Sequence, residues 1–469
     1  MKLMKEDNFN EIKKDDYNWR RGRTWSLIYY KDESLDQILK QAYLEFFYES
    51  TLNPMVFSSA QKMEKFVVNF ALEILNGNQL PNSSGLLTSG GTESIIMALK
   101  AYRNKARKKN KWWRNQNEII LPESTHVAFE KGAEILGLKV RKAKLKDDYS
   151  VDIENVKKLI NRRTLILVGS APQYPHGVID DISSLSKLAL ENNIGLHVDC
   201  CLGGYFLPWL EKLGIKLPLF DFRLEGVSSI SLDNHKFGYS AKGVSTLVYR
   251  DIDLMAEQFF ITTDWCGGLY ASPSFPGTKG IAPMATAYAA IKHLGQKGFI
   301  QNAQTLMNKT RELQKIITQN GELEIIGKPV MNVFAVKSNN PNLNVFVLAD
   351  QLQKKGWHVD RQQKPNSIHF ILNPQHLAHI DEFEIDFNQT VEELLMRPDK
   401  FNHAAEEGNA AIYGLVAKIP KGFNRFAKEE IRKVMKDMYR KNNHEYSDRI
   451  QMPKDDFKMK LTKKVLEYF

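Results

Sequence analysis

A lysine directly follows a histidine in a polar stretch near the middle of the chain, Ser231-Leu232-Asp233-Asn234-His235-Lys236-Phe237-Gly238. Upstream, the apolar segment 194–199 predicts a strand that ends on the carboxylate of Asp199. A lysine can bond covalently to an aldehyde, and a carboxylate can keep a pyridine nitrogen protonated. Pyridoxal phosphate (PLP) chemistry needs both groups. Although most of the 65 lysines and arginines are expected on the surface, Lys236 and Asp199 together indicate a PLP site.

A turn of small residues, Ser89-Gly90-Gly91-Thr92-Glu93-Ser94, precedes a helical pattern over residues 95–100. Glycines let the backbone approach an anion, and Thr92 can cap the helix, whose first free N–H groups point at a phosphate. The same turn could be a helix cap without a ligand. Its position in the chain, ahead of Asp199 and the His-Lys pair, favours phosphate binding by Gly91 and Thr92.

Two further segments stand in the order that such a site requires. In residues 121–132, a proline and small hydroxyl residues precede His126, which predicts a loop that presents an imidazole to the pyridine ring. Residues 165–177 predict a buried parallel strand followed by a turn-rich segment, where open α/β sheets bind ligands. A lone histidine is more often structural, so the role of His126 depends on the other motifs.

Patterning divides the chain into three predicted regions. Residues 1–58 form an N-terminal arm, and residues 59–300 alternate strand and helix patterns, as in a mostly parallel sheet with helices on both faces. Residues 301–469 form a smaller α+β domain with a charged helical tail. A chain of 469 residues exceeds the usual limit of a single core, about 250–300 residues, so more than one domain is expected.

Composition limits the class of protein. The cysteines Cys200, Cys201 and Cys266 form neither a disulfide framework nor a zinc spacing, so no metal site is predicted and a reducing compartment suits them. We expect neither a signal peptide nor a membrane span of about 18 apolar residues. The prediction is a soluble cytoplasmic protein, with export as a bacterial effector as the alternative.

The net charge of +10 favours contact with anionic membrane surfaces or phosphorylated lipids, unless it serves solubility alone. The lysine-rich segment 103–111 accompanies no recognisable nucleic-acid-binding motif. We therefore expect no nucleic-acid partner.

These motifs, spread over residues 25 to 415 and including Pro172-Gln173-Tyr174-Pro175-His176-Gly177-Val178-Ile179-Asp180, resemble the sphingosine-1-phosphate lyases among the group II decarboxylase-like PLP enzymes. The resemblance implies PLP fold type I, with a mostly parallel seven-stranded sheet. It also implies retro-aldol cleavage of a phosphorylated long-chain base to a fatty aldehyde and phosphoethanolamine. An amino acid decarboxylase and a catalytically weakened PLP- or lipid-binding homologue remain alternatives.

The resemblance also assigns roles to residues. Lys236 is similar to the Schiff-base lysine, Asp199 to the partner of the pyridine nitrogen and His126 to the ring-stacking histidine. The cofactor-phosphate residues that it implies are Gly91, Thr92, His235, Gly277 and Thr278. The substrate-side residues that it implies are Tyr29, Asn53, Lys242, Tyr270 and Tyr413.

A homodimer with shared active sites is a further implication, because the family places Asn53, Tyr270, Gly277 and Thr278 in the subunit opposite Lys236. Asn53 stands where these lyases carry a histidine. An amide can donate a hydrogen bond, but it cannot carry charge or shuttle a proton. We therefore expect an altered rate or substrate preference.

A second departure follows Thr278, where Lys279-Gly280 replaces the Arg-Pro of the family. Glycine lacks the backbone restriction of proline, so this loop is expected to be more mobile.

Overall fold

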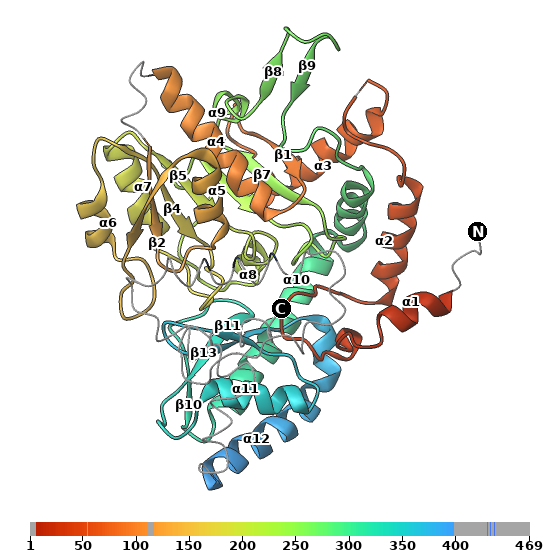
Figure 1. Ribbon diagram of the computed structural model, residues 1–469, viewed down its shortest axis with the longest axis vertical. Helices are drawn as coiled ribbons and strands as arrows, with labels where there is room; N and C mark the ends of the chain where they lie inside the picture. Colours follow the sequence, from red (N-terminus) through yellow and green to blue (C-terminus); the bar gives the residue numbers. More distant parts are fainter. Residues whose placement is uncertain are drawn as a thin grey trace.

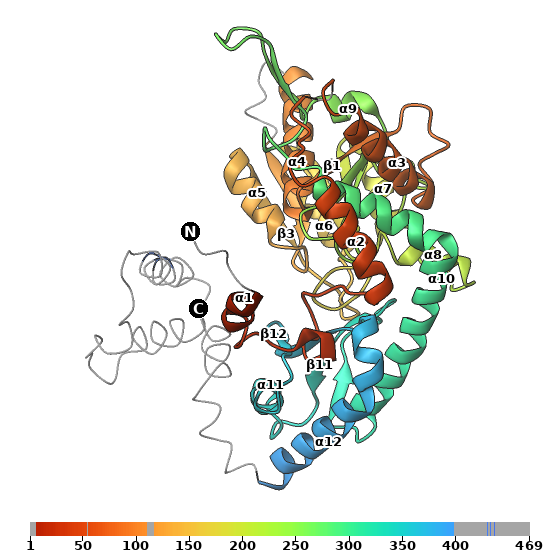
Figure 2. The same ribbon diagram turned by 90° about the vertical axis from the view of Figure 1, so that its right-hand side faces the viewer.

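The computed structural model describes residues 6–53, 55–109 and 117–397, together with Glu429, Arg432 and Lys436 in a helical segment. Tyr413, one of the predicted substrate-side residues, lies outside this part of the chain. The described residues form a large α/β domain and a smaller α+β domain. The long helix α10 (Ala282–Thr318) extends from one domain to the other (Figures 1 and 2).

The large domain contains a seven-stranded sheet in the order β1-β7-β6-β5-β4-β2-β3. Its strands, in chain order, are β1 (Ser84–Thr88), β2 (Glu118–Pro122), β3 (Lys139–Ala143), β4 (Thr164–Ser170), β5 (Gly195–Asp199), β6 (Ser229–Leu232) and β7 (Ser245–Tyr249). Only β7 runs against its neighbours, pairing antiparallel with β1 and β6. The prediction of a mostly parallel sheet with seven strands is confirmed.

Helices cover both faces of this sheet because its central strands are apolar on both sides. In β2, Ile119 and Leu121 join one hydrophobic cluster, whereas Ile120 joins the other. The first cluster is covered by α4 (Gly91–Lys109), α5 (Ala128–Leu136) and α9 (Ile252–Ala256). The second is covered by α3 (Ser58–Ile74), α6 (Ile153–Leu159), α7 (Ile182–Glu191), α8 (Leu207–Lys212) and α10.

The small domain is built on an antiparallel sheet in the order β10-β11-β13-β12. Its elements, in chain order, are β10 (Leu323–Ile325), β11 (Val333–Ser338), α11 (Val345–Lys354), β12 (Asp360–Gln362), β13 (Ser367–Ile371), a 3-10 helix (Pro374–His379) and α12 (Ile380–Met396). This arrangement agrees with the predicted α+β region. The proposed boundary at residue 300 lies within α10, five residues after its non-helical Gly295.

The N-terminal region packs against both domains. It contains α1 (Glu6–Ile12), a 3-10 helix (Trp19–Arg21) and α2 (Glu33–Glu45), which packs along α10 (Figure 2). The backbone of Trp25 accepts a 2.7 Å hydrogen bond from Ile371 and donates one of 3.1 Å to His358. Its indole is 1% exposed and stacks on His376. Part of the predicted arm is therefore built into the small domain.

A two-stranded hairpin, β8 (Phe260–Thr262) and β9 (Tyr270–Ser272), projects from the large domain (Figures 1 and 2). It and the loop after it expose several large apolar side chains, Phe260, Ile261, Trp265, Leu269 and Phe275. Within the described residues, no helix is long and apolar enough to cross a membrane.

Candidate active site

The carboxyl ends of β4, β5 and β6 meet at one edge of the large sheet and place polar side chains side by side. The strand register aligns Ser170, Asp199 and Ser231. Asp199 ends β5, is 7% exposed and accepts a 3.0 Å hydrogen bond from the backbone N–H of Cys201. This edge carries a carboxylate where parallel α/β sheets usually bind their ligands.

A cavity of about 350 Å³ lies at this edge. The predicted residues that line it are Gly91, Thr92, His126, Asp199, His235 and Lys236. The fold therefore brings together the five motifs that the sequence spreads over residues 89–238, including residues 165–177 through Ser170, Pro172 and Tyr174. The same cavity is lined by two acidic residues that we did not predict, Glu93 and Asp233.

The phosphate-loop motif forms the turn between β1 and α4. Because α4 begins at Gly91, Thr92 lies in the first helical turn and not at the cap, so the expected capping role is wrong. A Cβ atom on Gly91 would lie 2.8 Å from Asp233 and 3.0 Å from the Cys201 sulfur, so a larger residue would not fit. The Glu93 carboxylate accepts hydrogen bonds from the Ser89 N–H and hydroxyl at 2.7 and 2.6 Å. The loop is therefore ordered and closely approached, with its helical N–H groups available to an anion.

Lys236 follows β6 in a tight turn, and its Nζ atom lies 2.9 Å from the Asp233 carboxylate. The preceding His235 is held by a 2.8 Å hydrogen bond between its Nδ1 and the Val244 carbonyl. Burial lowers the pKa of His235. His126, in contrast, is largely exposed, and its Nδ1 accepts a hydrogen bond from the Ala128 N–H at 3.2 Å. The His126 ring therefore remains accessible at the rim of the cavity.

His197 is linked to Asp199 through the Ser231 hydroxyl. Its two ring nitrogens lie 2.8 and 3.1 Å from the hydroxyls of Ser229 and Ser231. The Ser231 hydroxyl in turn lies 3.5 Å from Asp199. Burial lowers the pKa of His197 to about 4, so the ring is neutral at physiological pH. Strand alternation places His197 and Asp199 on one side, whereas the serine link between them depends on the neighbouring strand.

Two predicted substrate-side residues, Tyr29 and Lys242, meet although they stand 213 positions apart in the chain. The Lys242 Nζ atom lies 4.9 Å from the Tyr29 ring centroid and donates a 2.8 Å hydrogen bond to the Leu27 carbonyl. Burial raises the pKa of Tyr29 to about 12. Burial, together with the charge of Lys236, lowers the pKa of Lys242 to about 8.

The remaining predicted residues do not line the Lys236 cavity. A Cβ on Gly277 would lie 2.7 Å from the Tyr270 hydroxyl, and Thr278 is the next residue. The same loop pairs with the N-terminal region through a bridge between Ser50 and Gly280. Asn53, three residues after Ser50, accepts a hydrogen bond from the Met55 N–H and is exposed. The four residues assigned to a partner subunit thus belong to segments that contact one another, and none of the four lines the Lys236 cavity.

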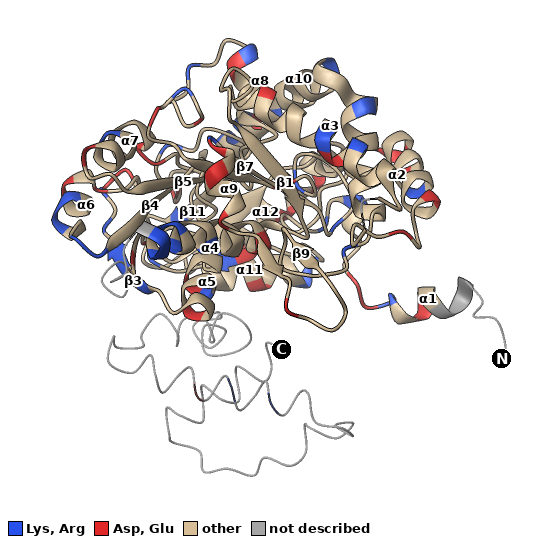
Figure 3. Ribbon diagram, turned by 90° about the horizontal axis from the view of Figure 1, so that it is seen from above, with Lys and Arg blue, Asp and Glu red and all other residues tan. Residues whose placement is uncertain are grey.

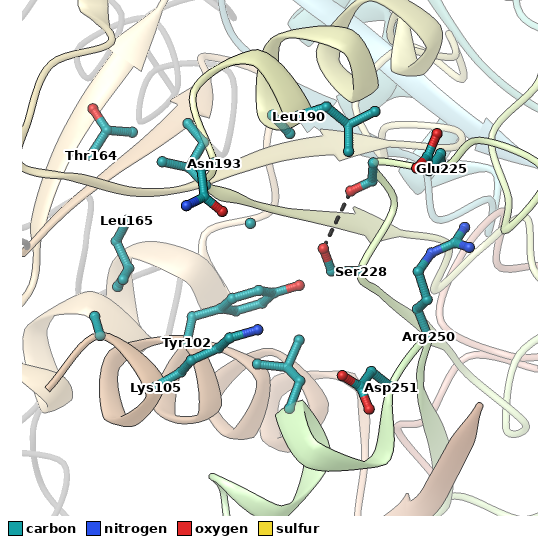
Figure 4. Close-up of a pocket in the computed structure, with 16 residues that line it drawn as sticks. Tyr102, Lys105, Thr164, Leu165, Leu190, Asn193, Glu225, Ser228, Arg250 and Asp251 are labelled. Atoms are coloured by element: carbon teal, nitrogen blue, oxygen red, sulfur yellow. Dashed lines mark hydrogen bonds between the residues drawn. The ribbon is translucent and has the colours of Figure 1, made fainter. Parts of the chain in front are cut away.

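A second cavity, of about 630 Å³, lies at the opposite edge of the sheet, where β4 and β5 begin (Figure 4). None of the predicted site residues lines it. Its Arg250 donates hydrogen bonds to the backbone carbonyls of Phe222, Leu224 and Val227. We assign no chemistry to this cavity.

The groups in the first cavity fit PLP. Lys236 supplies an amine, Asp199 a carboxylate for the pyridine nitrogen, and His126 an accessible ring. The Gly91 turn leaves no room for a side chain where the backbone would approach the phosphate.

Comparison with known proteins agrees with this donor set. Residues 49–337 match the pyridoxal-dependent decarboxylase conserved domain. Sphingosine-1-phosphate lyase 1 of Mus musculus is 37% identical over 412 residues, which cover 87% of this chain and 71% of the mouse protein. The structure of a Burkholderia pseudomallei sphingosine-1-phosphate lyase superposes with a TM-score of 0.79 at 33% identity, covering 86% of this chain and 94% of that chain.

A probable L-tyrosine/L-aspartate decarboxylase of Methanothermobacter thermautotrophicus is 34% identical over 349 residues, which cover 74% of this chain and 91% of that protein.

Proposed function

We propose that the protein is a PLP-dependent carbon–carbon lyase. The chain belongs to the pyridoxal-dependent decarboxylase family and, within it, to the sphingosine-1-phosphate lyases. Its substrate is sphingosine 1-phosphate or a related phosphorylated long-chain base, which it splits by retro-aldol cleavage. The products are a fatty aldehyde and phosphoethanolamine. The observation that carries this proposal is the single cavity that unites Lys236, Asp199, His126 and the Gly91 turn.

When bound, PLP supplies a covalent attachment point for an amine and accepts the electrons of the broken bond. We infer that Lys236 holds the cofactor covalently and that Asp199 faces its pyridine nitrogen. The N–H groups of Gly91 and Thr92 would bind the cofactor phosphate, with His235 beside them. The neutral His197 and Ser231 keep the Asp199 carboxylate oriented.

The substrate contacts that we propose depend on charge. Lys242 is a compact cation below about pH 8 and suits the substrate phosphate as a point charge. Tyr29 remains protonated at physiological pH and can donate a hydrogen bond, but it is a poor base. The substrate's hydroxyl proton, which leaves as the carbon–carbon bond breaks, therefore needs another acceptor.

We further infer that the functional unit is a homodimer with shared sites. Asn53, Tyr270, Gly277 and Thr278 belong to mutually contacting segments that do not line the Lys236 cavity. The exposed apolar side chains of the β8–β9 hairpin give this region an interface character. A second subunit would bury these side chains and deliver the four residues to the opposite cavity.

Cytoplasmic location and contact with an anionic membrane surface stay predictions. Figure 3 shows lysine and arginine interspersed with aspartate and glutamate over the elements on this face. The described elements in that view carry residues of both signs of charge, and the figure adds no support for membrane attraction.

An amino acid decarboxylase is the second candidate, favoured by the 34% identity to the archaeal decarboxylase over 91% of its length. The proposed residues Lys236 and Asp199 would serve either reaction, so the cavity by itself does not separate them. The substitution at Asn53 also leaves a binding protein with weak activity as an alternative.

The purified, PLP-saturated protein should be incubated separately with sphingosine 1-phosphate and with a panel of amino acids. Long-chain aldehyde and phosphoethanolamine in stoichiometric amounts support the lyase. Carbon dioxide from an amino acid, without aldehyde, would support the decarboxylase instead. Neither product, despite cofactor binding, would support the binding protein. The Lys236→Ala variant is the control for products that form without catalysis by this lysine.

A further inference from the structure

Asp233 is a second buried carboxylate in the cavity, and the chemistry proposed so far gives it no role. It follows β6 directly and is 3% exposed. Its Oδ1 atom accepts a 2.6 Å hydrogen bond from the Ser245 hydroxyl on β7. Its Oδ2 atom lies 2.9 Å from Nζ of Lys236. The sheet therefore holds one oxygen of Asp233, while the other faces the lysine.

The surroundings of Asp233 make this pairing strong. Further titratable groups that interact with Asp233 include His235, whose Nε2 lies 3.7 Å away, and Lys242. Burial by itself would lower the pKa of Lys236, but the facing Asp233 carboxylate raises that pKa above its ordinary value. Burial would also raise the pKa of Asp233, whereas Lys236, His235 and Ser245 bring it below its ordinary value. Both groups are therefore charged in the cofactor-free protein.

A charged lysine has no lone pair and cannot attack an aldehyde. Asp233 thus opposes covalent attachment of Lys236 and stabilises the free side chain. In the proposed reaction, the substrate amine takes the place of Lys236, so the lysine is set free in a pocket where its side chain is only 22% exposed. An ammonium in such a pocket is costly unless a carboxylate faces it.

We propose that Asp233 is a positioning residue that holds the free Lys236 side chain as an ammonium at the cavity whenever this lysine is not covalently engaged. Its part in the catalytic cycle rests on the proposed function, but the pairing in the cofactor-free protein does not. The competing explanation is that Asp233 only ties the turn to β7 through Ser245. That role would be insensitive to the charge on Asp233, because asparagine can accept the same hydrogen bond.

The test uses the full-length, cofactor-free protein and a short pulse of a small amine-acetylating reagent at a series of pH values. Modification of Lys236, whose side chain is 22% exposed, is followed by mass spectrometry, with exposed lysines as internal standards. In the wild type, the pH at which Lys236 reaches half of its maximal reactivity, its midpoint, should be higher than the midpoint of the standard lysines. Asp233→Asn should lower this midpoint by more than about one pH unit, or raise reactivity at fixed pH about tenfold.

The matched control is Asp221→Asn, which removes a buried carboxylate paired with Arg223 outside the cavity. It should leave the Lys236 midpoint unchanged, and circular dichroism verifies the fold of both variants. Overlapping curves for the wild type and Asp233→Asn would overturn the proposal. A wild-type midpoint at or below that of the standards would also overturn it, even if the variant does not fold.

The outcome is independent of substrate. A protein that cleaves no phosphorylated base but shows the shift contradicts the proposed function and leaves the role of Asp233 standing. A protein that cleaves the substrate but does not show the shift supports the proposed function and contradicts the role of Asp233. When cofactor is added to the cofactor-free protein at neutral pH, Asp233→Asn should also speed its covalent attachment, which is measured by the visible absorbance.

Discussion

Lys242 lies over the aromatic ring of Tyr29, with its Nζ atom 4.9 Å from the ring centroid. The lysine ammonium also donates a hydrogen bond to the carbonyl of Leu27, a residue with a positive φ of 70°. A bound phosphate would have to compete with this carbonyl for the Lys242 ammonium. The N-terminal region and the turn after Lys236 therefore form the proposed phosphate end of the substrate site together.

The charge of Lys242 should set the upper pH limit of activity. Because burial lowers the pKa of Lys242 to about 8, the cation that attracts the substrate phosphate is present below this pH and lost above it. We expect kcat/KM for the phosphorylated base to fall as pH rises through about 8. Lys242→Arg keeps the charge and should move this fall to higher pH. An identical profile for both proteins would show that another group causes the fall.

Asn53→His should raise kcat/KM for the phosphorylated base roughly tenfold, about 1.4 kcal/mol, because it restores one charge-assisted hydrogen bond. Steady-state kinetics below pH 7 measure this effect. Lys242→Ala should act in the opposite direction and more strongly, since it removes a full charge. If Asn53→His changes nothing while Lys242→Ala abolishes activity, the substitution at Asn53 is silent. If neither variant matters, the phosphate-site assignment is wrong.

Lys236→Ala should abolish the visible absorbance of covalently attached cofactor, since no other lysine lines the cavity described here. Asp199→Asn should keep that absorbance and lose most of the turnover, because the pyridine nitrogen would lack its anionic partner. Spectra and single-turnover rates of the two variants separate attachment from catalysis. An unaltered spectrum in Lys236→Ala would exclude Lys236 as the attachment site.

Two inactive variants should complement each other if the sites are shared. Mixing Lys236→Ala with Tyr270→Phe under conditions of subunit exchange should restore one intact site per heterodimer, because the two residues would serve opposite cavities. Activity is compared with each homodimer, and exchange is verified by native mass spectrometry. Persistent inactivity of verified heterodimers would place both residues in the same site.

Glu93→Gln should weaken cofactor binding. One Glu93 oxygen accepts from the Ser89 N–H and hydroxyl, and the other accepts a 2.9 Å hydrogen bond from the Phe275 N–H. An amide can accept at only one end, so one loop loses its tie, at a cost of about 1–3 kcal/mol. Equilibrium titration with PLP should give a dissociation constant at least about fivefold higher, and an unchanged constant would contradict this role.

The motifs around the cavity could be predicted because each is a local pattern. The apolar residues of β2, β4 and β5, the small residues before α4 and the strand-end Asp199 restrict the backbone within a few residues. Because these strands are parallel, their carboxyl ends bring the motifs to one edge of the sheet. The alternation of strand and helix patterns over residues 59–300 likewise predicted that helices cover both faces of the sheet.

Other features required the tertiary structure. The pairing of Trp25 with His358 and Ile371, the hydrogen bond from Lys242 to Leu27 and the bridge between Ser50 and Gly280 join segments far apart in the chain. No local period encodes which of these segments meet, because packing of the whole chain decides it.

Asp233 shows the same limit at short range, since it stands only three residues before Lys236. Side-chain directions in an irregular turn follow no fixed period, in contrast to those in a helix or strand. The sequence alone determined the fold class and indicated His126, Asp199 and Lys236 as groups of one site. Only the tertiary structure decided which charges face one another there, because that depends on how β6, β7 and the turn between them pack around Asp233.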